Sequence, residues 1–206
     1  MLRGALLLLF LPALFCAETK DVTVVMDFAE GFSPQALQEM QAEAGRIVRK
    51  AGVKLAFLHR NEAAQDSYSE LVVFKMSGRC EMDSFPALLD ERGPLAFTLT
   101  TEGRILPFGE LKCDRLRESI KTAMVGSDFN KGNQLLGRAM GRVLAHELYH
   151  MLARTKGHGK GGVARDALSA RQLIAENLEL GDHDCAFLRS AWHARRLLKA
   201  ARSQPY

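Results

Sequence analysis

The residues of this chain best suited to chemistry form the pentapeptide HELYH at positions 146–150, which has the pattern HExxH. On a helix, side chains four positions apart lie on one face, so His146 and His150 can present two imidazoles to one metal ion. Glu147 lies about 100° further round the helix, where its carboxylate can take a proton from a water that the metal activates. The pattern therefore predicts a metal site with an adjacent general base.

The flanking sequence indicates that this pentapeptide lies on a helix. No proline occurs between residues 133 and 154, and apolar side chains recur there every three or four positions. This spacing is typical of a helix that buries one face. Gly137 and Gly141 lie four positions apart in the same stretch, so we expect tight packing against them.

The preceding part of the chain predicts the other elements of one α+β domain. We expect strands at residues 21–28, 53–58, 71–76, 95–100 and 104–108, the last two joined as a hairpin by a glycine turn. We expect one helix to run from Ser33, its N-cap, to a stop at Gly52. A second helix is expected at residues 114–125 with Asp114 as its cap, followed by a polar loop at residues 126–132.

This order of elements, together with HExxH, resembles the zincin metalloproteases, in which a twisted sheet lies over the active-site helix. The resemblance implies a zincin-like α+β fold with a twisted mixed sheet, here followed by a helical C-terminal tail. It also implies Zn²⁺ held by three protein ligands, with a fourth position left for water. In that fold the hairpin supplies an edge strand antiparallel to the bound peptide. The backbone of residues 96–101 is then the candidate peptide shelf.

His158 is the expected third zinc ligand, because Gly157 should turn the chain immediately before it. The helix is expected to end near Thr155 or Lys156. In the metzincin branch of the zincins, the pattern HExxHxxGxxH places the third histidine six residues after the second, where this chain has Lys156. His158 comes eight residues after His150, which is similar to a looser bacterial subgroup with a displaced third histidine.

The methionine that metzincins place beneath the metal is missing from this chain. No methionine follows Met151, and the stretch GVAR at residues 162–165 stands in the corresponding place, with Ala164 at the methionine position. Other residues compete with His158 for the role of third ligand. They are Glu176 and Glu179, which would match a thermolysin-like arrangement, and Asp166, His183 and Asp184.

The N-terminus has the pattern of a secretory signal peptide at residues 1–17: a basic residue, an apolar run too short to span a membrane, and a small residue at Ala17. We therefore expect a secreted or periplasmic protein. Its metalloprotease domain should occupy residues 18–166. Residues 167–206 should form a helical C-terminal extension packed on that domain.

Export permits disulfide bonds. Three cysteines follow the predicted signal peptide, at positions 80, 113 and 185. Cys80 and Cys113 flank one strand-rich segment and are the expected pair, which leaves Cys185 as a buried thiol. Closing this loop would stabilise the fold by about 3–4 kcal/mol through the unfolded state.

Charge gives little reason to expect a nucleic-acid partner, because the formal net charge is only +4. In the C-terminal extension, Ser169 and Gln172 form a capping-box pattern that predicts a helix to residue 180. A second helix is expected at residues 182–202. This second helix is basic, and we interpret it as a solvated helix on the domain surface, without membrane contact.

These features predict an exported zinc-dependent metallopeptidase whose partner is a peptide or protein substrate. His146, His150 and His158 would hold Zn²⁺, and Glu147 would be the general base that activates water for attack on the peptide bond. Two alternatives remain. One is a non-catalytic zincin-like metal-binding protein of the cell envelope, and the other is a zinc amidase that acts on the cell wall. Glu147 favours a catalytic site, whereas the displaced His158 favours the binding protein.

Overall fold

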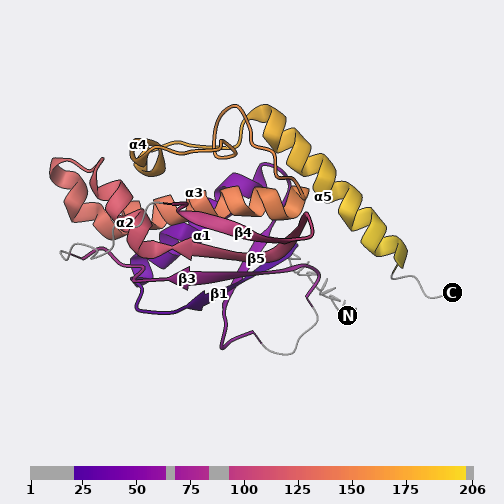
Figure 1. The fold of residues 1–206 in the computed structure, drawn as a ribbon, viewed down its shortest axis with the longest axis horizontal. Coiled ribbons are helices and arrows are strands. Elements are labelled where there is room, and N and C mark those ends of the chain that lie inside the picture. Colours follow the sequence, from indigo (N-terminus) through magenta and orange to yellow (C-terminus); the bar gives the residue numbers. More distant parts are fainter. Residues whose placement is uncertain (1–20, 64–67, 84–92, 203–206) are drawn as a thin grey trace, which may run out of the picture.

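The structure is a computed structural model that describes residues 21–63, 68–83 and 93–202. The predicted signal peptide at residues 1–17 lies outside the described residues. Within them the chain forms a mixed α/β fold built on one five-stranded sheet (Figure 1). None of the helices in these ranges combines the length and the apolar character needed to cross a membrane.

The sheet has the strand order β2-β1-β3-β5-β4. Its strands are β1 (Val22–Phe28), β2 (Leu55–His59), β3 (Leu71–Ser77), β4 (Ala96–Thr101) and β5 (Arg104–Lys112). β1 is parallel to β2 and β3, and β3 is parallel to β5, whereas β4 runs antiparallel to β5 at one end of the sheet. The predicted hairpin is confirmed. Its two turn residues, Glu102 and Gly103, both have positive φ, at 47° and 78°, as a tight hairpin turn requires.

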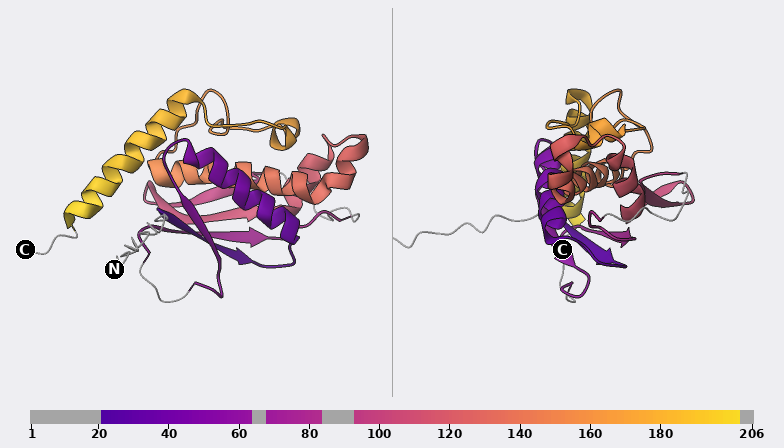
Figure 2. Two further views of the ribbon diagram at one scale, coloured as in Figure 1. Left: turned by 180° about the vertical axis from the view of Figure 1, so that it is seen from behind. Right: turned by 90° about the vertical axis from the view of Figure 1, so that its left-hand side faces the viewer.

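The helices are α1 (Pro34–Arg49), α2 (Cys113–Lys121), the 3-10 helix η1 (Gly126–Lys131), α3 (Gly132–Ala153), α4 (Ala170–Ile174) and α5 (Asp182–Arg202). Figure 2 shows α1 and α3 side by side over one face of the sheet, with α4 and the start of α5 beyond them. Buried and more exposed side chains alternate along β3, whereas the first five residues of β1 are all buried, as in a central strand. The predicted HExxH helix is therefore the central helix of the molecule.

Two predictions for the segment before α3 are wrong. Asp114 does not cap α2, because the helix begins one residue earlier and its N-cap is Lys112. The Asp114 carboxylate instead accepts a hydrogen bond from the backbone N–H of Arg79, at 3.1 Å, and pairs with Arg117. The predicted polar loop that follows is the 3-10 helix η1.

The helix predicted from Ser169 to residue 180 is also too long. Ser169 and Gln172 do form the expected capping box, but α4 ends at Ile174. The buried guanidinium of Arg142, on α3, donates to the carbonyl oxygens of Gln172 at 2.6 Å and Glu176 at 3.3 Å. These long-range hydrogen bonds from Arg142 thus compete with the longer helix that the local sequence pattern favours.

The packing of α1 against α3 depends on two glycines, as expected. A Cβ atom on Gly137 would lie 2.3 Å from the carbonyl oxygen of Ala36, and one on Gly141 would lie 2.8 Å from that of Met40. Only residues without a side chain allow the two helices to approach this closely. The same interface holds an ion pair between Glu43 and Arg142 at 2.8 Å.

Cys80 and Cys113 form a disulfide with a Cα–Cα distance of 4.9 Å, which confirms the predicted pair. The bond links the end of β3 to the start of α2, and both residues are fully buried. Cys185 is a free, buried thiol, also as predicted.

Candidate metal centre

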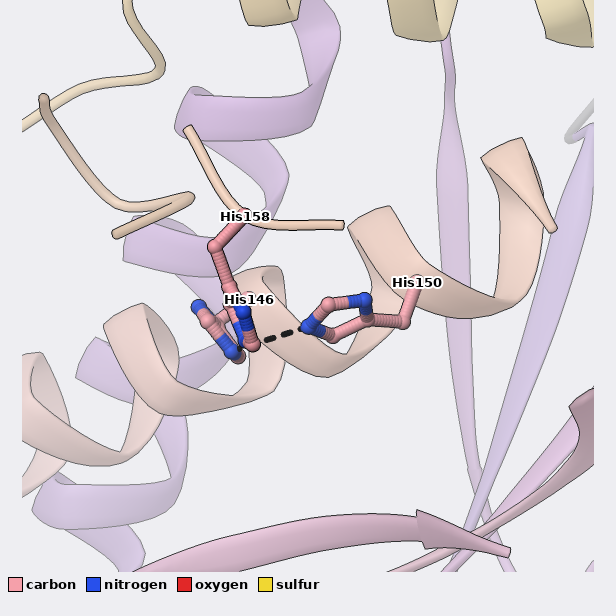
Figure 3. Close-up of side chains that lie close together, drawn as sticks. All are labelled: His146, His150 and His158. Atoms are coloured by element: carbon pink, nitrogen blue, oxygen red, sulfur yellow. Dashed lines mark hydrogen bonds between the residues drawn. The ribbon is translucent and has the colours of Figure 1, made fainter. Parts of the chain in front are cut away.

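The first two candidate ligands lie on one face of α3, because four residues separate them on a regular helix. The Nε2 atoms of His146 and His150 are 3.1 Å apart, joined by the dashed line in Figure 3. For comparison, two nitrogens bound to one tetrahedral zinc at about 2.05 Å would be separated by about 3.3 Å. The helix alone thus brings two nitrogens to a spacing that suits a single ion.

The third candidate ligand, His158, returns to the helix after a sharp turn. α3 ends at Ala153, and Arg154 adopts a left-handed conformation with φ of 50°. The turn is therefore earlier than the predicted one at Gly157. The His158 ring stacks on that of His146, with centroids 5.3 Å apart, and meets His150 edge-on at 4.8 Å. Candidate ligand atoms from the three histidines all lie within 4.8 Å of one another.

Two backbone carbonyl groups determine which ring nitrogen each helical histidine offers. The Nδ1 atom of His146 lies 2.8 Å from the carbonyl oxygen of Val163, and that of His150 lies 2.7 Å from the carbonyl oxygen of Thr155. A carbonyl oxygen can only accept, so each Nδ1 must carry the proton. Each Nε2 then has a free lone pair, and the two lone pairs face one another. Such an arrangement calls for a cation between them, and the residues present therefore fit a metal ion.

His158 is held less firmly than the other two histidines. Its Nδ1 atom lies 3.4 Å from a carboxylate oxygen of Asp166, a side chain that is 87% exposed. This contact leaves Nε2 of His158 for the ion, in the carboxylate–histidine–metal arrangement common at metal sites. Asp166 was one of the competing candidate ligands, and its carboxylate instead contacts the candidate ligand His158.

The burial of the helical histidines favours their metal-binding form. Burial lowers the pKa of His146, and the hydrogen bond with Val163 only partly opposes this. Burial likewise lowers the pKa of His150, against the effect of its contact with Thr155. A lower pKa means that the neutral imidazole, which is the form that binds metals, persists to lower pH.

Glu147 points from α3 toward the edge of the sheet. Its side chain is buried, and its Oε2 atom accepts a 2.6 Å hydrogen bond from the hydroxyl of Thr98 on β4. Burial raises the pKa of Glu147, and the bond from Thr98 partly offsets this rise. The site thus combines three imidazole side chains with a carboxylate whose proton affinity is increased.

Two cavities flank the cluster. The first, of about 250 Å³, borders His146 and Glu147 and is lined by residues 93–96, by Val143 and by residues 165–168, which include two charged side chains. The second, of about 660 Å³, borders His158 and the start of α5. The two cavities thus border different members of the cluster.

The remaining candidate ligands do not belong to the cluster. Glu179 forms ion pairs with Arg46 on α1 and with Lys50, which follows that helix. His183 is almost fully exposed and contacts only its neighbour Asp184, at 3.5 Å. Within the described ranges, the three histidines are the single group of three or more His, Cys, Asp or Glu residues suited to an ion, so Glu176 has no place in it.

Sequence reasoning missed the groups that orient this cluster. The carbonyl groups of Val163 and Thr155 carry no signal in the sequence, because every residue has one. Thr98 lies on the strand that was expected to bind peptide, but a strand pattern does not reveal which helix its side chains face. Only long-range pairing places it beside Glu147.

No protein-family model matches this chain, and no curated protein is significantly similar to it. The chain itself establishes a mixed α/β fold with a cluster of three histidines that could bind a metal ion. Its function is therefore inferred from the chemistry of the cluster.

Proposed function

We propose that the protein is an exported zinc-dependent metallopeptidase of the zincin type. His146, His150 and His158 hold the zinc, and Glu147 is the general base. The observation that carries the proposal is the placement of a buried carboxylate directly beside a three-histidine cluster. A purely structural metal site has no use for that carboxylate.

The donor set supports zinc as the ion. Three imidazole ligands suit a borderline-soft divalent cation, and three protein ligands with one open position are typical of catalytic zinc. When bound, the ion supplies Lewis-acid chemistry, making a water more acidic and polarising a carbonyl group.

The other steps belong to residues of the chain. Glu147 accepts a proton from the attacking water and delivers it to the leaving amine. A carboxylate whose pKa is raised by burial can do both near neutral pH. β4 lies at the end of the sheet beside Glu147 and can pair with an extended peptide in the antiparallel sense. The cavity beside His146 can receive one side chain of that peptide.

A closed, non-catalytic metal site is less well supported. Structural zinc sites usually have four protein ligands. Within the described residues the cluster has three, and Glu176 and Glu179, which could have closed it, are not part of it. A zinc amidase would use the same residues and differ only in the amide bond that it cleaves.

The direct test is cleavage of a broad peptide library by the purified, zinc-loaded protein and by Glu147→Gln. The amide keeps the shape of the side chain but cannot act as a base, so we expect the rate to fall by about 10²- to 10⁴-fold. Glu30→Gln, at an exposed position before α1, is the control and should cleave like the wild type.

Two results would reject the proposal. One is equal cleavage by the wild type and Glu147→Gln. The other is zinc binding by the wild type without cleavage of any peptide, and a cell-wall amide would then be the next substrate to test.

A further inference from the structure

The hydrogen bond between Thr98 and Glu147 joins the edge of the sheet to the central helix. The Thr98 hydroxyl lies 2.6 Å from Oε2 of Glu147, a short distance that is typical of a bond to an ionised carboxylate. Side chains alternate along β4, so Ala96 and Thr98 face α3 while Leu99 points away and is 46% exposed. Thr98 is thus directed at the carboxylate by the strand itself.

The pairing of the hairpin becomes irregular immediately after Thr98. Thr98 pairs with Gly109, but Thr100 pairs with Ile105, so one residue of β4 lies opposite three residues of β5. Pro107 is one of the three, and its nitrogen has no hydrogen to donate to the ladder. Such irregularities bend and twist a strand and are common beside active sites. Thr98 is therefore the last residue of the regular segment that lies against α3.

Gly109, the residue opposite Thr98 on β5, determines how closely α3 approaches the sheet. A Cβ atom on Gly109 would lie 2.6 Å from the ring of Phe74 and 3.0 Å from the side chain of Met151, the residue that follows His150. The missing side chain lets Met151 pack directly on the sheet at this point. α3 is then close enough for a side chain as short as threonine to reach Glu147.

We propose that Thr98 is a positioning residue whose hydroxyl holds Oε2 of the Glu147 carboxylate in the orientation that accepts the proton of the attacking water. The proposal rests on the proposed function, because it assigns Thr98 a part in the same reaction. Thr98 itself does not touch the reacting atoms. It acts by limiting the carboxylate, which has several rotamers, to one orientation.

Two substitutions separate the hydroxyl from the shape of the side chain. Thr98→Val keeps the shape and removes the donor, whereas Thr98→Ser keeps the donor. We expect Thr98→Val to lower kcat by about 10- to 100-fold with little change in KM, because a hydrogen bond to a charged group is lost. Thr98→Ser should stay close to the wild type.

Two controls show whether the effect passes through Glu147. In the Glu147→Gln background, Thr98→Val should cause no further loss, because the two residues act as a unit. Thr122→Val makes the same chemical change after α2, where the hydroxyl donates only to the carbonyl of Ser119, and should leave kcat unchanged. Equal kcat values for Thr98→Val and the wild type would overturn the proposal.

A crystal structure of the zinc-loaded protein gives a second readout that needs no substrate. We expect Oε2 of Glu147 within hydrogen-bonding distance of the Thr98 hydroxyl and the carboxylate directed toward the metal. A Glu147 side chain turned away from Thr98 would overturn the proposal. If no peptide is cleaved, the proposed function fails, and the crystal structure alone then decides whether Thr98 holds Glu147.

Discussion

His146 and His150 are each oriented by a main-chain carbonyl group, that of Val163 and that of Thr155. No side-chain substitution can delete these acceptors, so the two ligands depend on the path of the chain after α3. His158 differs, because its partner is the exposed carboxylate of Asp166. At the scale of single residues, His158 is therefore the least firmly oriented of the three candidate ligands.

His158→Ala should weaken zinc binding by roughly 100-fold or more, since it removes one of three ligands. The two helical histidines would remain and should still bind the ion weakly. Zinc affinity can be measured by competition with a chromophoric chelator. His193→Ala, which removes an exposed histidine on α5, is the control and should bind zinc like the wild type. Unchanged affinity of His158→Ala would remove His158 from the site.

The single residues that the sequence predicted are those whose role follows from spacing along one element. His146, Glu147 and His150 could be assigned because a helix has a fixed period. His158 could be assigned because a turn was expected between it and the helix, although the structure places that turn at Arg154. Thr98 could not be assigned, because its role arises where two distant segments meet.

At the scale of elements, the close packing of α1 on α3 determines where the HExxH helix lies. Gly137 is one of two positions on α3 where the backbone of α1 leaves no room for a side chain. Arg142, on the same helix, is fully buried and donates to Glu43 on α1 as well as to α4 and the segment after it. Hydrogen bonds from Arg46 and Arg142 outweigh the effect of burial and lower the pKa of Glu43, so this pair stays ionised.

Gly137→Ala should destabilise the protein by about 1–3 kcal/mol, because the added methyl group would force the helices apart. Gly45→Ala is the matched substitution on α1. A Cβ atom there would meet nothing within 4 Å, so the greater helix propensity of alanine should stabilise the protein by about 0.5–1 kcal/mol. Urea unfolding of both variants measures the two free energies. The same sign for both changes would contradict the packing described here.

The lengths of the elements were predictable only where local and long-range preferences agree. The start of α3 was predicted within one residue, because an unbroken apolar face spans the helix, whereas its end at Ala153 comes two to three residues before the predicted one. α4 is much shorter than predicted, because Arg142 binds carbonyl groups that a longer helix would have used. A buried arginine on a distant helix leaves no signature in the segment that it shortens.

At the scale of the whole molecule, the strand order was not predictable. Parallel pairing of β1 with both β2 and β3 depends on crossovers that local patterns do not specify. The disulfide was predictable, because only three cysteines follow the predicted signal peptide and two of them flank one segment. It fixes the end of β3 to the start of α2, at a boundary between sheet and helices.

Reduction of the Cys80–Cys113 bond should lower the free energy of unfolding by about 3–4 kcal/mol, since the bond closes a long loop in the unfolded chain. Urea unfolding with and without a reductant measures this difference. A thiol assay on the denatured, unreduced protein that lacks residues 1–17 should detect Cys185 alone. Three thiols would show that the bond does not form.

The ligands also differ in when they become available. The pair on α3 exists as soon as that helix is formed. His158 joins only after the chain has turned back, in a loop where the backbone N–H of Val163 donates to the carbonyl of Glu179. A metal ion bound by all three histidines would therefore tie this loop to α3, and we expect its escape to require the loop to open.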